Sequence, residues 1–111
     1  MRKGPYLPRC KNDHVKLRFM IGGDTQSFTV SRQFLSDASP FFRKWLKDKR
    51  REDLYFEDID KHDLKLLLDV QAGEARINAT NIGMLSLESE RYQMMDVVKK
   101  CRQYRSSLEL Y

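Results

Sequence analysis

The sequence predicts an α+β domain in which a small mixed sheet of short strands packs against a cluster of five or more helices. Near the N-terminus, apolar residues alternate with polar ones, which is the pattern of half-buried strands. Further along, apolar residues recur every three or four positions, which is the pattern of amphipathic helices. The 111 residues have the length of one domain, since a domain typically has about 100–150 residues.

The strands are expected mainly in the first half of the chain. Residues 1–12 contain two prolines and a glycine, which indicates an irregular lead-in. Alternation from Val15 to Ile21 predicts one strand, and a second short strand at 28–30 follows the turn signal at 22–24, so the two should form a hairpin. Alternation at 54–56 predicts a third strand.

Three helices are indicated by residues that suit their ends. Ser31 can cap a short helix. Ser39 followed by Pro40 starts a second helix, because the N–H that proline lacks would have no partner there. Asp60 caps a third helix, which Gly73 ends. This third helix is apolar almost all round, so we expect it to be buried and central.

The C-terminal part is expected to hold one more strand and two helices. Residues 75–77 are long enough only for an edge strand, and a helix should begin at Thr80. The last helix contains an apolar stripe with the helical spacing of 3, 4, 3 and 4 residues. Cys101 lies within this stripe, so we interpret it as a core residue and not as a reactive thiol. The stripe consists of Met94, Val97, Cys101, Tyr104 and Leu108.

The net charge of +5 is unevenly distributed, which bears on nucleic-acid binding. Residues 1–51 carry 13 basic and 4 acidic side chains, whereas residues 52–111 carry 8 basic and 12 acidic ones. The basic run from Arg43 to Arg51 is followed at once by six acidic residues between Glu52 and Asp63. Those carboxylates would repel a polyanion, so nucleic-acid binding is disfavoured; a steep salt dependence of binding would indicate it.

The sequence contains no recognisable catalytic or metal-binding motif. It lacks a nucleophile motif, a His-Glu-x-x-His pair and a glycine-rich phosphate loop. His62 and Asp58 could be drawn as an acid–base pair, but a surface helix cap explains His62 better. Cys10 and Cys101 do not have the spacing of a metal site or a disulfide framework. We therefore expect no enzyme, no metal and no cofactor. Without a leader or a spanning segment, we expect an intracellular protein of the cytoplasm or nucleus with no membrane partner.

Aromatic and methionine side chains are more numerous than a small core readily holds. Trp45 and Tyr104 are explained as core residues. Tyr55 lies on the opposite strand face from its neighbours, and Tyr92 lies between the last two helices, so we expect both to be exposed. Aromatic residues, methionine and arginine are enriched at the centres of protein interfaces. The sequence thus favours a protein-binding surface.

An ordered series of motifs resembles the BTB/POZ domain family. Residues 28–42, FTVSRQFLSDASPFF, are similar to its signature of a short strand followed by two helix starts. Residues 54–73 resemble its third strand and the buried helix that ends in glycine, and residues 77–101 resemble its closing helix pair. The resemblance covers residues 13–105, with 106–111 as a tail or helix end. It is closest to divergent BTB domains found alone or attached to MATH domains, which are abundant in nematodes.

The resemblance implies a BTB/POZ fold and a non-catalytic protein–protein interaction module that self-associates and often serves as substrate adaptor for a cullin-3 ubiquitin ligase. An unknown substrate would bind through another domain, as expected if the chain is an excised fragment. The family's cullin motif, an apolar residue, any residue, then Glu, matches Arg50-Arg51-Glu52. Arg50 replaces the apolar anchor, which forfeits about 1.5–3 kcal/mol of burial, so we expect weakened cullin binding. The candidates for the cullin interface are Trp45, Leu46, Lys49, Arg50, Glu52 and Tyr92.

The resemblance also implies a dimer contact between an Asp before the first strand and an Arg of the other copy. Arg32 matches the Arg, whereas His14 occupies the Asp position and Asp13 lies one residue early. The lead-in is too short for the extra strand and helix that longer members exchange, so we expect a modest homodimer. Its candidate residues are Asp13, Arg32, Gln33 and Leu35. The alternatives are a self-association domain of a transcription or chromatin regulator and a tetramerisation-type adaptor domain.

Overall fold

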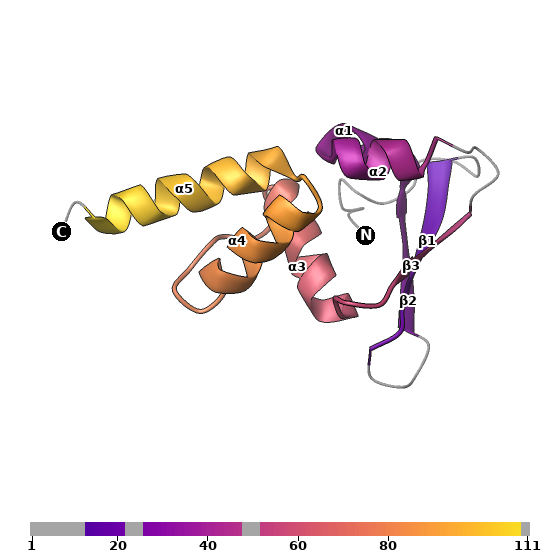
Figure 1. Cartoon of the computed structure of the whole chain (residues 1–111), viewed down its shortest axis with the longest axis horizontal. Coiled ribbons are helices and arrows are strands. Elements are labelled where there is room, and N and C mark those ends of the chain that lie inside the picture. Colours follow the sequence, from indigo (N-terminus) through magenta and orange to yellow (C-terminus); the bar gives the residue numbers. More distant parts are fainter. Residues whose placement is uncertain (1–12, 22–25, 48–51, 110–111) are drawn as a thin grey trace.

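The polypeptide forms a small mixed sheet and five helices in the computed structural model, which describes residues 13–21, 26–47 and 52–109. The sheet lies at one end of the molecule, α4 and α5 lie at the other, and α3 lies between them (Figure 1). This arrangement confirms the predicted α+β class. In chain order, the elements are β1 (His14–Phe19), β2 (Gln26–Ser31), α1 (Arg32–Ala38), α2 (Pro40–Trp45), β3 (Asp53–Phe56), α3 (Lys61–Gln71), α4 (Ile82–Arg91) and α5 (Met95–Glu109).

The sheet has the strand order β2-β1-β3, with β1 antiparallel to β2 and parallel to β3. Leu17, at the centre of β1, pairs with Phe28 on one side and with Leu54 on the other. Val15, Leu17 and Phe19 are fully buried, because alternate side chains of a strand point to the same face. The first three predicted strands and the hairpin pairing are confirmed, while the predicted turn at 22–24 lies outside the described residues.

The predicted helix ends are also confirmed. Ser31, Ser39 and Asp60 each accept a hydrogen bond from the backbone N–H three residues later, at 3.0, 3.1 and 2.7 Å. Each bond satisfies an N–H that has no partner within the helix. Pro40 stands in the first turn of α2. Gly73 follows α3 with a φ of 80°, a left-handed conformation that glycine adopts without strain.

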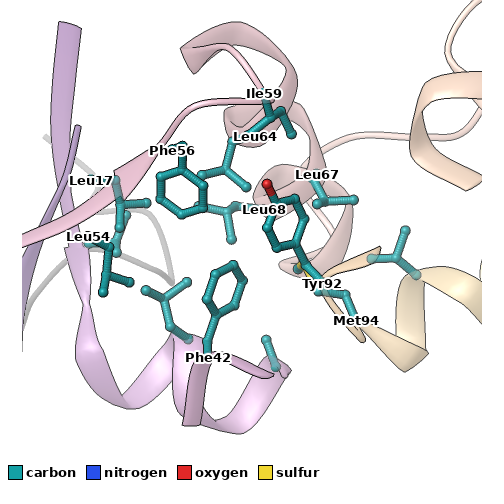
Figure 2. Close-up of a cluster of buried hydrophobic side chains, with 14 of the residues drawn as sticks. Leu17, Phe42, Leu54, Phe56, Ile59, Leu64, Leu67, Leu68, Tyr92 and Met94 are labelled. Carbon is teal, nitrogen blue, oxygen red and sulfur yellow. The ribbon is translucent and has the colours of Figure 1, made fainter. Parts of the chain in front are cut away.

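The core lies between the inner face of the sheet and α3. Figure 2 shows Phe42, Phe56 and Tyr92 pointing toward one another beside the leucines of α3. The Phe42 ring is 5.6 Å from the Tyr92 ring and 6.1 Å from the Phe56 ring, centroid to centroid. Helix α3 is central, as predicted, because it supplies several of the most buried side chains. These are Leu64, Leu67, Leu68 and Val70.

Two predictions about the C-terminal part are wrong. Residues 75–77 form no strand. The N–H of Ala75 donates to the Asp69 carbonyl, and the Arg76 carbonyl accepts from the Asn81 side chain, so this backbone is hydrogen-bonded to its neighbours and not to the sheet. The apolar stripe of α5 is buried only as far as Cys101; Leu108 is 55% exposed, because α5 extends past the end of α4 (Figure 1).

Within the described part of the chain, no helix has both the length and the apolar character needed to cross a membrane.

Candidate functional site

Helix α2 presents two aromatic side chains at the surface. Phe41 is 37% exposed and Trp45 is half-buried. They lie one helical turn apart, which places them on the same side of the helix, and their rings meet edge to face with centroids 5.5 Å apart. Phe42 between them is fully buried. We call Phe41 and Trp45 the aromatic ridge.

Two hollows flank the aromatic ridge. The first, which we call the acidic hollow, has a volume of about 290 Å³, and the second, the Lys44 hollow, about 580 Å³. Ligand pockets typically have about 300–1,000 Å³, so the acidic hollow is at the lower limit of that range and the Lys44 hollow lies within it. Besides the ridge, the acidic hollow is lined by Tyr55, Phe56, Glu57, Asp58, Arg91 and Tyr92. The Lys44 hollow is lined, besides the ridge, by Pro40, Lys44 and Gln93.

Tyr92 forms a wall of the acidic hollow and is otherwise buried. Only 7% of it is exposed, so the prediction of an exposed Tyr92 is wrong. Its ring stacks on Phe42 and meets Phe41 edge to face, both at 5.6 Å. Burial raises the pKa of the Tyr92 hydroxyl, the charges of Glu88 and Asp58 raise it further, and Arg91 lowers it.

The backbone at Tyr92 is held in place by α2. The Ser39 hydroxyl, which is fully buried, donates to the Tyr92 carbonyl. The following residue, Gln93, has a φ of 55°, which turns the chain sharply between α4 and α5. Ser39 therefore connects the start of α2 to the α4–α5 junction, and this connection fixes the Tyr92 ring against the aromatic ridge.

Carboxylates outnumber cations among the charged side chains at the acidic hollow. Arg91 Nη2 is 2.6 Å from Asp58 Oδ2, and Arg91 Nη1 is 3.4 Å from Glu88 Oε2. The Arg91 guanidinium carbon also lies 5.7 Å from the centre of the Tyr92 ring, a distance typical of a cation–π contact. Glu57 is exposed and has no ion-pair partner among the described residues. Arg91 thus pairs with Asp58 and Glu88 and leaves the Glu57 carboxylate unpaired within the described part of the chain.

The candidates for a cullin interface lie partly on this surface. Trp45 and Tyr92 both line the acidic hollow. Leu46 is 5% exposed and belongs to the core. Glu52 is exposed, and its carbonyl accepts from the Lys16 N–H at 2.8 Å, which anchors the start of β3. The remaining two candidates, Lys49 and Arg50, lie outside the described residues.

The candidates for a dimer interface lie around the start of α1. Asp13 accepts from the Ser31 hydroxyl at 2.7 Å and from the Gln33 N–H at 3.0 Å, so it helps to cap α1 within its own chain. Gln33 is exposed and Arg32 is half-buried. Leu35 is fully buried, so its side chain cannot reach a second copy without disruption of the core.

Other groups considered in the sequence do not form a site. The ligand atoms of Asp60, His62 and Asp63 lie within 4.8 Å of one another, but Asp60 caps α3, and the positive end of a helix dipole disfavours a cation. Asp58 pairs with Arg91 and not with His62. Cys101 is 2% exposed, as predicted, and burial raises the pKa of its thiol.

Sequence reasoning did not find three members of the acidic hollow, namely Glu57, Asp58 and Arg91. In the sequence the two carboxylates belong to an acidic run, Asp58 is considered only as a partner of His62, and Arg91 lies 33 positions from Asp58. No periodicity or motif relates residues so far apart, so only the folded chain reveals the pair.

Comparison with known proteins identifies the family. The BTB/POZ domain profile matches residues 8–108, which is most of the chain. The chain is 31% identical over 103 residues to Signal element on autosome protein 2 of Caenorhabditis elegans; the match covers 93% of this chain and 5% of that protein's length.

Solved structures show the same fold. The BTB domain of zebrafish PATZ1 superposes with a TM-score of 0.68 at 17% identity, covering 84% of this chain and 75% of that one. The BTB domain of human gigaxonin gives a TM-score of 0.66 at 21% identity, covering 81% of this chain and 75% of that one. With the family profile matched over most of its length, this chain belongs to the BTB/POZ domain family of non-catalytic protein–protein interaction modules.

Proposed function

We propose that this BTB domain is an adaptor module that docks the N-terminal region of cullin-3 on the face formed by the aromatic ridge and its two hollows. The surface pair of Phe41, which is 37% exposed, and half-buried Trp45 carries this proposal. Tryptophan is among the residues that contribute most to binding energy at interfaces, phenylalanine is enriched at their centres, and the two hollows beside the ridge can receive side chains of a partner.

The position of Glu52 supports the same proposal. Glu52 matches the last residue of the family's cullin motif and is exposed directly before β3. Three residues later, Tyr55 lines the acidic hollow and is 54% exposed. Glu52 is thus followed directly by β3, and β3 contributes Tyr55 to this face.

Calorimetric titration with the cullin-3 N-terminal region tests the proposal. We expect weak binding by the wild type and at least about tenfold tighter binding by Arg50→Met, because an apolar anchor restores about 1.5–3 kcal/mol of burial. Phe41→Ala should weaken binding, whereas Leu87→Ala should not, because Leu87 is 65% exposed on α4 and lines neither hollow. If neither wild type nor Arg50→Met bound, the ligase adaptor role would be wrong.

The proposal includes a modest homodimer formed through the start of α1. Arg32 and Gln33 lie on the first turn of α1, and Asp13 lies beside them through its bond to the Gln33 N–H. Leu35 is left out because it is fully buried. Sedimentation velocity at increasing concentration should show a monomer–dimer equilibrium that Gln33→Glu shifts toward monomer, because the substitution adds a carboxylate beside Asp13 and Asp37 and a two-fold interface contains that added charge twice. A monomer alone at high micromolar concentration would contradict the dimer.

A further inference from the structure

The acidic hollow has a local charge opposite to that of the chain. The chain as a whole carries +5. The lining of the hollow contains two carboxylates and one guanidinium, which is a net charge of −1, and the guanidinium also pairs with the buried carboxylate of Glu88 behind the lining. A cation is therefore attracted to the hollow although the chain as a whole is basic. The charged lining residues are Glu57, Asp58 and Arg91.

The aromatic walls of the hollow are suited to the same cation. Trp45, Tyr55 and Tyr92 line it, and the faces of such rings attract ammonium and guanidinium groups. The domain already provides one example, because Arg91 stands 5.7 Å from the centre of the Tyr92 ring while its guanidinium binds Asp58. Arg91 thus uses the Tyr92 wall, which leaves the Trp45 and Tyr55 walls beside the unpaired carboxylate of Glu57.

The other side of the aromatic ridge has the opposite charge. The Lys44 hollow contains a lysine and no carboxylate among its lining residues. A basic side chain of a partner that crosses the ridge is therefore repelled on one side and attracted on the other. This difference in charge favours one orientation of a partner on the docking face, the one that places a basic residue of the partner at the acidic hollow.

We propose that the acidic hollow binds a lysine or arginine side chain of the docked partner, with the cation held between the Glu57 carboxylate and the rings of Trp45 and Tyr55. This inference rests on the proposed function, since it names the chemistry by which the partner enters this face. The long aliphatic stem of the basic side chain packs along the apolar rings while its charged end reaches the carboxylate.

Short peptides test the inference without cullin. The probes are acetylated, amidated pentapeptides Ala-Leu-X-Leu-Ala in which X is arginine, lysine or citrulline, a neutral isostere of arginine. Trp45 is the only tryptophan, so its indole N–H gives one NMR signal that reports on the ridge. We expect saturable shifts of this signal at millimolar concentrations for the arginine and lysine peptides. The citrulline peptide should bind at least about threefold more weakly, because it lacks the charge.

Variants of the hollow sharpen the test. Glu57→Gln and Tyr55→Leu should each weaken binding of the arginine peptide by about two- to fivefold. Glu74→Gln is the matched control, because it removes the same charge from an exposed residue that does not line the hollow. It should bind the peptide as the wild type does. Equal binding of arginine and citrulline peptides, or an unchanged affinity of Glu57→Gln, would overturn the inference.

The outcomes for the hollow and for the proposed function can be told apart. If cullin bound equally well to wild type and Glu57→Gln and the peptides did not shift the Trp45 signal, the inference would be wrong and the adaptor role would stand. If the peptides bound in a way that depends on Glu57 while cullin did not bind, the hollow would still recognise a basic side chain and the cullin proposal alone would fail.

Discussion

Replacing Ser39 with alanine removes two buried hydrogen bonds at once. The Ser39 hydroxyl accepts from the Phe42 N–H at 3.1 Å as the cap of α2, and it donates to the Tyr92 carbonyl. Loss of a cap costs about 1 kcal/mol, and a buried carbonyl left without a partner costs about 1–3 kcal/mol. We therefore expect Ser39→Ala to lower the free energy of unfolding by about 2–4 kcal/mol.

Urea unfolding followed by Trp45 fluorescence measures this loss. The slope of free energy against urea should stay that of the wild type, because the surface exposed on unfolding is the same. Ser31→Ala is the matched comparison, since Ser31 caps α1 and also donates to Asp13. It should cost only about 1 kcal/mol, because Asp13 remains partly open to water and keeps its bond to the Gln33 N–H. If Ser39→Ala cost no more than Ser31→Ala, the bond to Tyr92 would contribute nothing.

Three further predictions concern buried and exposed groups. Burial raises the pKa of Tyr92 above its ordinary 10.0, so the folded state keeps the hydroxyl proton to a higher pH than the unfolded state does, and the free energy of unfolding should fall as pH rises past about 10. In urea titrations from pH 8 to 11, Tyr92→Phe should lessen that fall. A fall as large as that of the wild type would contradict the prediction. The variant Cys10→Ser leaves Cys101 as the single thiol. A disulfide reagent should react with this thiol much more slowly in the folded variant than in the same variant unfolded in urea, because folding buries the thiol and raises its pKa. Equal rates in the two states would refute this. Leu68→Ala should lower the free energy of unfolding by about 2–5 kcal/mol, because Leu68 is fully buried. Leu108→Ala should lower it by less than about 0.5 kcal/mol, because Leu108 is 55% exposed. Similar losses for the two variants in urea unfolding would show that α5 is buried to its end.

Local signals predicted most of the fold. The alternation around Leu17 indicates a strand because one face of the sheet is buried, and the cap at Ser39 with Pro40 indicates a helix start because of hydrogen-bonding rules that act within four residues. Both signals depend only on neighbours in the chain. The predicted strand at 75–77 fails because its apolar character reflects packing against the core, while its backbone bonds to Asp69 and Asn81.

The candidate site was less predictable because its parts come from distant segments. Tyr92 lies in a connection between helices, where exposure is the ordinary expectation, yet its ring completes the core beside Phe42. The pairing of Asp58 with Arg91 joins the loop after β3 to the end of α4. Such contacts depend on how the helices and strands pack against one another. The spacing of residues in the sequence does not indicate that packing.

The parallel pairing of β1 with β3 has a consequence for how the docking face forms. In this pairing Lys16 lies opposite Asp53, and α1 and α2 are both contained in the intervening chain. Closing so long a loop costs entropy before any contact compensates for it, so β3 should join the sheet late in folding. Tyr55 and the loop beyond it reach the aromatic ridge only when this step is complete. Newly synthesised chains should therefore acquire their binding surface at the end of folding, when the sheet has all three strands.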